Sequence, residues 1–380
     1  DYFGGIPGSP ELLEGYNPAT WMLECIGAGV GKASSNDVDF VQYFNESEEK
    51  RVLDVNMNKE GVTFPSPDTK EMSFDCKRAS SSWTQARFLA VRFMRMYWRT
   101  PSYNITRCII ALLLSLLAGL VFVDSEYTTY QGLNSGVGML FLMSLFNGLV
   151  SFSSVLAIAS DDRASFYRER ASQSYNALWY FVGSTIVEIP YSFVAGLLFT
   201  VVFFPMVGFT GFGTGVLFWI NMSLFMLMQT YMGQFFSYAM PNIEVADVLG
   251  MLINSIYILF MGFNPPANKI PSGYKWLYDI TPHKYSIGAL AALVFADCDD
   301  APTWNEQAQQ YVGGGSQLGC QPVTNTPLSI DHTTVKEYVE TVFNTKHDDI
   351  WRNFGIAFVF IVVYRVLGLL ALRFVNHQKR

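Results

Sequence analysis

Long apolar stretches dominate the sequence beyond residue 104, whereas residues 1–104 are polar and carry charges, Pro, Gly and Ser throughout. A helix needs roughly 20 mostly apolar residues to cross a hydrocarbon core of about 30 Å. We therefore predict six transmembrane helices, at residues 108–123, 133–160, 178–206, 215–240, 245–263 and 354–374. The third and fourth are separated by a cluster of glycines within residues 208–215, which is typical of a tight connection.

The positions of Arg and Lys predict how these helices are oriented. Basic residues precede the first helix, lie between the second and third, and follow the sixth, whereas the connections after the first and third contain none. Because Lys and Arg accumulate in cytoplasmic loops, we predict that both termini are cytoplasmic. Residues 264–352 then form a large loop on the outer side. Within it, residues 276–296 are apolar but interrupted, and we expect short helices that dip back into the outer leaflet.

Two cysteines, Cys298 and Cys320, fall in this outer loop. Disulfides persist in oxidising compartments, so a bond between them is the favoured interpretation, and two unpaired thiols are the alternative. The other three cysteines, Cys25, Cys76 and Cys108, fall on the reducing side or in the membrane, where cysteine behaves as a small apolar residue.

Composition supports a membrane protein. Half of the 380 residues are hydrophobic and only 15% are charged, where an average soluble chain has about 25% charged residues. This excludes a disordered, collagen-like or disulfide-dense chain. The formal net charge of −7 gives no general attraction to nucleic acid, so we expect no nucleic-acid partner. The apolar excess must lie in lipid, and the bilayer is the first expected partner.

Catalytic and metal-binding motifs are missing from the sequence. The stretch from Gly27 to Ser34 approaches the phosphate-binding pattern GxxxxGK[ST], but Ile26 occupies the first position and Ala33 the last. We interpret it as a flexible linker. The four histidines are scattered and form no HExxH motif. We therefore expect no catalytic residue, no metal site and no cofactor in this chain.

Ionisable and amide groups inside the predicted helices indicate polar contacts at membrane depth. Glu188 and Arg365 are expected to face the interior of the bundle. For Glu188, next to Pro190, we favour a packing role over substrate contact, and Arg365 is expected to pair within the bundle. A mixture of Met, aromatic and amide groups on the second and fifth helices suits a pocket for bulky amphipathic molecules, although plain helix packing is the simpler explanation. The candidate cavity residues are Met143, Phe146, Asn147, Val150, Asn254, Ser255 and Ile258.

Residues 161–177 form a short cytoplasmic connection that carries both acidic and basic residues. Its composition favours helix. It is either a docking element for a cytosolic partner or a solvated turn.

Several motifs resemble one family. The segment Tyr2-Phe-Gly-Gly-Ile-Pro-Gly8 and the run Gly15-Tyr-Asn-Pro-Ala-Thr-Trp-Met-Leu23 resemble the stretch that follows the second nucleotide-binding domain of pleiotropic drug resistance transporters, the full-size G-subfamily ABC proteins. Phe166-Tyr-Arg-Glu-Arg-Ala171 resembles their first cytoplasmic coupling loop. Val187-Glu-Ile-Pro-Tyr191 and Phe260-Met-Gly-Phe263 fit the same pattern. The resemblance covers essentially the whole chain and points to the C-terminal transmembrane half.

This resemblance implies an all-α fold, a six-helix ABC-2 type (type V exporter) domain with a cysteine-containing extracellular loop between helices five and six. The implied organisation is a cytoplasmic segment (1–82), an amphipathic connecting helix (83–104), the transmembrane domain (105–374, with the loop at about 264–352) and a cytoplasmic tail (375–380). ATP and Mg would be bound by nucleotide-binding domains upstream, which together with the first transmembrane half are the implied partners in the same polypeptide.

The resemblance also implies roles for individual residues. The coupling loop would comprise Phe166, Arg168, Glu169 and Arg170, with Arg168 and Glu169 contacting the ATPase domains. A valve would lie at Phe263 and Asn264, where Asn264 departs from the apolar residue expected. The disulfide Cys298–Cys320 matches relatives.

The function implied is the transmembrane half of an ATP-driven exporter of hydrophobic or amphipathic compounds (xenobiotics, drugs or lipids), located in the plasma membrane. The alternative is a non-transporting scaffold or receptor whose outer loop binds a ligand.

Overall fold

The computed structural model describes residues 2–26, 39–59, 61–64, 80–308, 310–328 and 332–375, and the single residues 66, 70, 73, 78, 330 and 377. The chain divides into two compact units, Asp1–Lys77 and Arg78–Arg380. The glycine-rich stretch 27–34, Cys76 and most of the expected tail 375–380 lie outside the described residues.

The described part of the first unit consists of short helices. They are a 3-10 turn (Phe3–Gly5), α1 (Pro18–Cys25), α2 (Phe40–Glu46) and α3 (Glu48–Met57). Helix α1 starts at Pro18 because the Asn17 side chain accepts a hydrogen bond from the amide of Ala19 and proline is favoured at the first helical position. The Trp21 indole donates to the Pro10 carbonyl at 3.0 Å and fixes the preceding segment against this helix.

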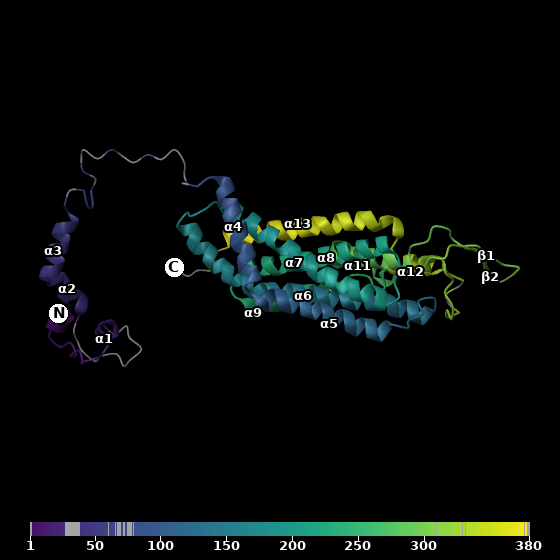
Figure 1. The fold of residues 1–380 in the computed structure, drawn as a ribbon, viewed down its shortest axis with the longest axis horizontal. Coiled ribbons are helices and arrows are strands. Elements are labelled where there is room, and N and C mark those ends of the chain that lie inside the picture. The colour runs from purple at the N-terminus through teal and green to yellow at the C-terminus, as the bar shows by residue number, and fades with distance from the viewer. Residues whose placement is uncertain are drawn as a thin grey trace. The chain divides into compact units, whose positions relative to one another are not determined.

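The second unit is a helical bundle (Figure 1). Helices α5–α8 and α13 run side by side, and α4 crosses one end of the bundle. The helices are α4 (Ser82–Trp98), α5 (Pro101–Phe122), α6 (Tyr130–Ala171), α7 (Ala177–Met206), α8 (Phe212–Ala239), α9 (Ile243–Leu259), α10 (Lys275–Ile280), α11 (Pro282–Phe295), α12 (Val335–Phe343) and α13 (Ile350–Phe374). Polar caps mark several starts: the side chains of Ser81, Thr129 and Asn242 accept backbone hydrogen bonds at the first turns of α4, α6 and α9.

Within the described residues, five helices are long and apolar enough to cross a membrane: α5, α6, α7, α8 and the segment His347–Phe374 that contains α13. In α5 only 28% of the most apolar window is buried inside the protein, so most of this helix presents apolar side chains that suit contact with lipid. The sequence also predicts a crossing over residues 245–263. Helix α9 occupies this region but has 17 residues.

Two helices differ from the expected boundaries. Helix α6 has 42 residues and continues through the motif Phe166–Ala171, because residues 161–171 contain no Pro or Gly that would end it. The expected coupling loop is therefore the last turns of a helix. Helix α5 begins at Pro101 and not at Cys108, so the end of the expected connecting helix (83–104) belongs to α5.

The distal region, which we define as residues 264–346, lies at the end of the bundle opposite α4 (Figure 1). The short helices expected within residues 276–296 are α10 and α11, and α11 is almost entirely buried against α8 and α13. Strand β1 (Thr303–Asn305) pairs antiparallel with β2 (Gln310–Val312). A disulfide joins Cys298 to Cys320, whose Cα atoms are 5.0 Å apart, so the favoured interpretation of the two cysteines is confirmed.

Candidate coupling and transport site

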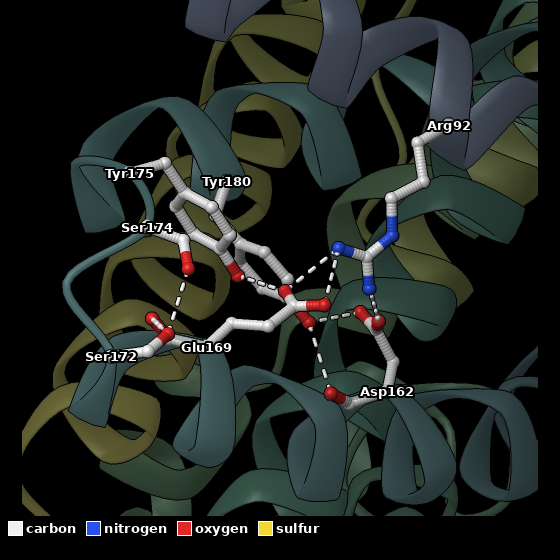
Figure 2. Close-up of polar contacts among 7 residues, drawn as sticks. All are labelled: Arg92, Asp162, Glu169, Ser172, Ser174, Tyr175 and Tyr180. Atoms are coloured by element: carbon white, nitrogen blue, oxygen red, sulfur yellow. Dashed lines mark hydrogen bonds and ion pairs between the residues drawn. The ribbon is translucent and has the colours of Figure 1, made fainter. Parts of the chain in front are cut away.

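The coupling motif at the end of α6 is bound to α4 by an ion pair (Figure 2). Arg92 of α4 donates from Nη1 to both carboxylate oxygens of Glu169 at 2.7 Å. The Tyr175 hydroxyl, in the turn after α6, donates to the same carboxylate at 2.6 Å. Burial, together with this hydrogen bond to Glu169, raises the pKa of Tyr175, so the phenol keeps its proton at neutral pH and remains a donor.

A second carboxylate lies two helical turns earlier on the same face of α6. Asp162 accepts a hydrogen bond from the hydroxyl of Tyr180, near the start of α7, and its Oδ1 is 4.0 Å from Nη2 of Arg92. Burial lowers the pKa of Arg92, but the hydrogen bonds to Glu169 and the negative charges of Glu169 and Asp162 together raise it by more. Arg92 thus remains charged between two carboxylates and ties α4 to α6 and α7.

The other residues of the motif divide into buried and exposed groups. Phe166 is buried and packs on the ring of Tyr180, with centroids 4.6 Å apart. Arg170 donates to the carbonyl of Arg373 in α13 at 2.6 Å. Arg168 is exposed and makes no side-chain hydrogen bond or ion pair in the part of the chain that the structure describes. Among these residues, Arg168 is available to contact another domain.

The two ionisable residues expected at membrane depth belong to one buried network. Glu188 of α7 is fully buried and accepts hydrogen bonds from Tyr97 (2.7 Å), Tyr103 and Nε2 of Gln234 (2.6 Å). The Gln234 carbonyl oxygen in turn accepts from Arg365 of α13. Arg365 also donates from Nε to Thr185 at 2.6 Å. Gln234 therefore bridges acid and base, and the network joins α4, α5, α7, α8 and α13.

The sequence did not single out a third buried charge, Arg107. Arg107 is one of the basic residues that precede the first predicted helix (108–123), but it lies within α5 and is 2% exposed. Its Nη2 donates to the carbonyl of Ser151 (3.0 Å) and to the hydroxyls of Ser154 and Thr230. The early start of α5 at Pro101 is the signal that places Arg107 in the bundle.

The seven candidate cavity residues lie on α6 and α9 and point in different directions. Met143, Asn147 and Asn254 are buried, Val150 and Ile258 are partly buried, and Phe146 and Ser255 are exposed. The amide nitrogens of Asn147 and Asn254 donate to carbonyls one turn earlier on their own helices. The Asn254 carbonyl oxygen accepts from Gln229 of α8 at 2.9 Å. Asn254 therefore attaches α9 to α8, and the exposed members remain open to a partner or ligand.

Helices α6 and α9 lie alongside one another over this region. A Cβ atom on Gly250 would come within 1.9 Å of the Phe152 ring, so the glycine allows a close approach. Farther along, Phe263 stacks on Phe141, with centroids 4.8 Å apart. These contacts lie on either side of the candidate cavity residues in both segments, so the stretch of α6 that carries these residues runs past the corresponding stretch of α9.

The two candidate valve residues follow α9. Phe263 is sandwiched between Phe141 of α6 and Phe343 of α12, whose ring centroid lies 5.7 Å away. Asn264 is exposed. The apolar contact therefore involves Phe263 and joins the bundle to the distal region.

Sequence reasoning also missed His283, at the start of α11. Its Nε2 is 2.7 Å from Nε2 of Gln229, the same amide that donates to Asn254. This contact connects the distal region to the polar positions behind the candidate cavity. Elsewhere among the described residues, no group of three His, Cys, Asp or Glu side chains is placed to hold a metal ion.

Comparison with known proteins gives a consistent set of relatives. Residues 84–295 match the family described as ABC-2 type transporter, and residues 309–380 match the family described as CDR ABC transporter. The chain is 28% identical over 383 residues to "Pleiotropic drug resistance protein 1" of Nicotiana tabacum, which covers all of this chain and 24% of the relative. It is 30% identical to "ABC transporter G family member 38" of Oryza sativa subsp. japonica, over 82% of this chain and 21% of the relative. It is 31% identical to "ABC transporter G family member 43" of Arabidopsis thaliana, over 79% of this chain and 21% of the relative. The chain thus spans about a quarter of the length of these relatives.

Proposed function

The chain belongs to the ABC-2 type transporter family, and from this premise we propose that it is the membrane-spanning half of an ATP-driven exporter of hydrophobic or amphipathic compounds. The observation that carries the proposal is the attachment of the last turns of α6 to α4 through Arg92 and Glu169. It provides a rigid cytoplasmic element on which a motor domain can act.

The energy source lies outside this chain. The relatives are about four times longer than the matched region, so the longer polypeptide has room for nucleotide-binding domains and a first transmembrane half. ATP and Mg are bound there. This chain supplies the path and the contact surface.

The proposed topology has six crossings, with α9 as the fifth. At 1.5 Å per residue its 17 residues span about 26 Å, close to the hydrocarbon thickness. With six crossings both termini face the cytoplasm, and the distal region faces outward, as its disulfide suggests. The plasma membrane is the location we propose.

Movement passes along α6. At 1.5 Å per residue this 42-residue helix is about 63 Å long, so it extends beyond the membrane into the cytoplasm. A motor domain that contacts Arg168 displaces the end of α6. Arg92 and Arg170 attach α4 and α13 to this end of α6, so both helices move with it. The part of α6 that carries the candidate cavity residues is displaced as well.

The transported compound contacts exposed and partly buried positions of the two neighbouring helices. These are Phe146 and Val150 of α6 and Ser255 and Ile258 of α9, and they face the other transmembrane half. Met143, Asn147 and Asn254 are buried behind them, and Asn254 attaches α9 to α8. The ring of Phe263, with Asn264 beside it, closes the path toward the distal region.

An efflux assay tests this function. Cells that express the full polypeptide should expel a hydrophobic fluorescent dye in an ATP-dependent manner. Phe146→Ala and Ile258→Trp should alter the efflux rate severalfold, because they change the shape of the cavity. Leu120→Ala, on the exposed face of α5 (70% exposed), is the matched control and should leave the rate unchanged. Unchanged efflux in both cavity variants would contradict the cavity, and the absence of ATP-dependent efflux in the unaltered polypeptide would contradict the function.

A further inference from the structure

Helix α4 has an exposed face that the coupling contacts do not use. Four side chains, Gln85, Leu89, Phe93 and Tyr97, point inward and are buried. The opposite side is exposed over the whole length of the helix, with Trp83 (77%), Phe88 (70%) and Trp98 (76%) as its most exposed members. Three arginines, Arg87, Arg95 and Arg99, are exposed on the same side.

Apolar and basic side chains share this exposed face. At 100° per residue, Trp83, Met94, Trp98 and Val91 fall within an arc of about 80°, and Arg87 lies within it. Arg95 and Arg99 follow on one side of this arc, with Phe88 between them. Tryptophan and other apolar side chains together with arginines on one exposed face are typical of a helix that lies in the lipid–water interface.

Among the described residues, no ion-pair or hydrogen-bond partner of the side chains of Arg87, Arg95 and Arg99 is found. Helix α4 contains no Asp or Glu. By contrast, Arg92 is neutralised by Glu169. The face therefore carries three uncompensated positive charges beside exposed tryptophans.

The position of α4 brings this face to a membrane surface. The helix crosses the end of the bundle and does not run along the long apolar helices (Figure 1). Only two residues separate Trp98 from the start of the membrane-spanning helix α5 at Pro101. Trp98 and Arg99 must then lie close to the boundary between hydrocarbon and head groups, where tryptophan is enriched in membrane proteins.

We propose that the exposed face of α4 binds acidic phospholipids of the cytoplasmic leaflet. The guanidinium groups of Arg87, Arg95 and Arg99 contact lipid phosphates and carboxylates, and Trp83 and Trp98 enter the interface at the two ends of the helix. Guanidinium suits this contact because it donates two parallel hydrogen bonds to a phosphate. The lipid holds α4 in the plane of the membrane while α6 transmits movement. The binding does not depend on which compound is transported.

Lipid-specific association with the full polypeptide tests the proposal. The protein is reconstituted in phosphatidylcholine bilayers, and electron spin resonance measures the fraction of spin-labelled phosphatidylserine, or of spin-labelled phosphatidylcholine, that is immobilised by the protein. A basic residue near an anionic surface contributes about 1 kcal/mol, which is about fivefold in association. We expect phosphatidylserine to associate severalfold more strongly at low salt, and this preference to weaken as salt is raised.

Substitutions assign the preference to α4. Arg99→Gln should lower it by up to about fivefold, and the triple variant Arg87→Gln, Arg95→Gln, Arg99→Gln should abolish it. The triple lysine variant at these positions should retain it, because charge is kept. Arg352→Gln, at the opposite end of the bundle with a side chain that is 63% exposed, is the matched control and should change nothing.

Three results would overturn the proposal. The first is equal association of the two lipids with the unaltered protein, as expected if a protein domain covers this face. The second is a preference that survives the triple glutamine substitution. The third is a preference that the Arg352→Gln control removes to the same extent. If the triple variant is poorly folded, the three single variants give the same test, since each should lower the preference.

Discussion

At the scale of single residues, Glu188 illustrates how a carboxylate is retained at membrane depth. Two tyrosine hydroxyls and one amide donate to it, and Gln234 connects it to Arg365. A buried charge is costly unless it is paired and hydrogen-bonded. The network therefore makes the relative positions of α4, α5, α7, α8 and α13 depend on one another.

Glu188→Leu should destabilise the protein by about 3 kcal/mol, because it leaves the donors Tyr97, Tyr103 and Gln234 without their acceptor and removes the negative charge of the network. Thermal unfolding in detergent measures the effect. Glu244→Leu, at an exposed position in the first turn of α9, is the control and should change the midpoint little. Equal midpoints for the two variants would show that the network does not stabilise the bundle.

The Arg92–Glu169 pair makes a separate prediction about coupling. Arg92→Gln and Glu169→Gln should each lower the amount of compound transported per ATP hydrolysed, because each separates α4 from α6. The double variant should be about as impaired as either single variant, since contacting residues are not additive. Transport and ATP hydrolysis measured in the same proteoliposomes give the ratio. Additive losses would contradict a shared function of the pair.

Residue-scale predictions from sequence were limited by distance along the chain. Glu188 and Arg365 were recognised as bundle-facing because charge at membrane depth is rare. Their connecting residue was not, since Gln234 is 46 positions from the acid and 131 from the base. The same limit applies to Arg92, which is 77 positions from Glu169. Pattern reasoning finds such residues singly, and only the fold brings them together.

At the scale of elements, the contact between α6 and α9 depends on a missing side chain. A Cβ on Gly250 would overlap the Phe152 ring. Gly250→Ala should therefore cost about 1–3 kcal/mol through overpacking and lower efflux by shifting α9. Gly355→Ala in α13 is the matched control, because no atom lies within 4 Å of its added methyl group. There alanine should stabilise the helix by up to about 1 kcal/mol.

The midpoints of thermal unfolding of Gly250→Ala and Gly355→Ala measure the expected loss and gain of stability. Phe152→Leu in the Gly250→Ala background should recover part of the loss, because it makes room for the methyl group. Similar midpoints for both alanine variants would contradict the close contact.

The disulfide stabilises the distal region as an element. It closes a loop with a sequence separation of 22 residues, for which chain entropy gives about 3 kcal/mol. Cys298→Ser, Cys320→Ser and the double variant should reduce abundance at the cell surface to the same extent, since each removes the same bond. Surface labelling measures abundance. A double variant with much lower abundance than either single variant would contradict a single shared bond.

The predicted helix boundaries agree with the structure where polar residues or glycines mark the end of a helix. They are wrong where no such residue marks it. The glycines near residue 211 correctly separate α7 from α8. The charges at residues 161–163 end the apolar stretch, and α6 continues through them to Ala171, as the composition of residues 161–177 favours, because charged side chains are compatible with a helix in water. The predicted start of α5 is too late, because residues 101–107 are polar enough to fall outside the apolar stretch although they form the first turns of the helix.

At the scale of the whole molecule, the fold class was predictable because one property, the length of the apolar stretches, determines it. Five of these stretches are helices long enough to cross a membrane in the described residues. Whether helix α9 crosses the membrane is harder to predict from its length, since 17 residues are the lower limit for a spanning helix. The arrangement of the distal region was outside the reach of the sequence, because its contacts join residues 128–130 to residue 324.

Glycosylation mapping tests the six-crossing topology most directly. Gln307→Thr creates an acceptor sequon at Asn305, which is exposed at the end of β1. The native sequon at Asn45 is the internal control. We predict that the variant gains mass that an endoglycosidase removes and that the unaltered protein does not change. A glycan at Asn45, with none at Asn305, would place the distal region in the cytoplasm and contradict the exporter topology.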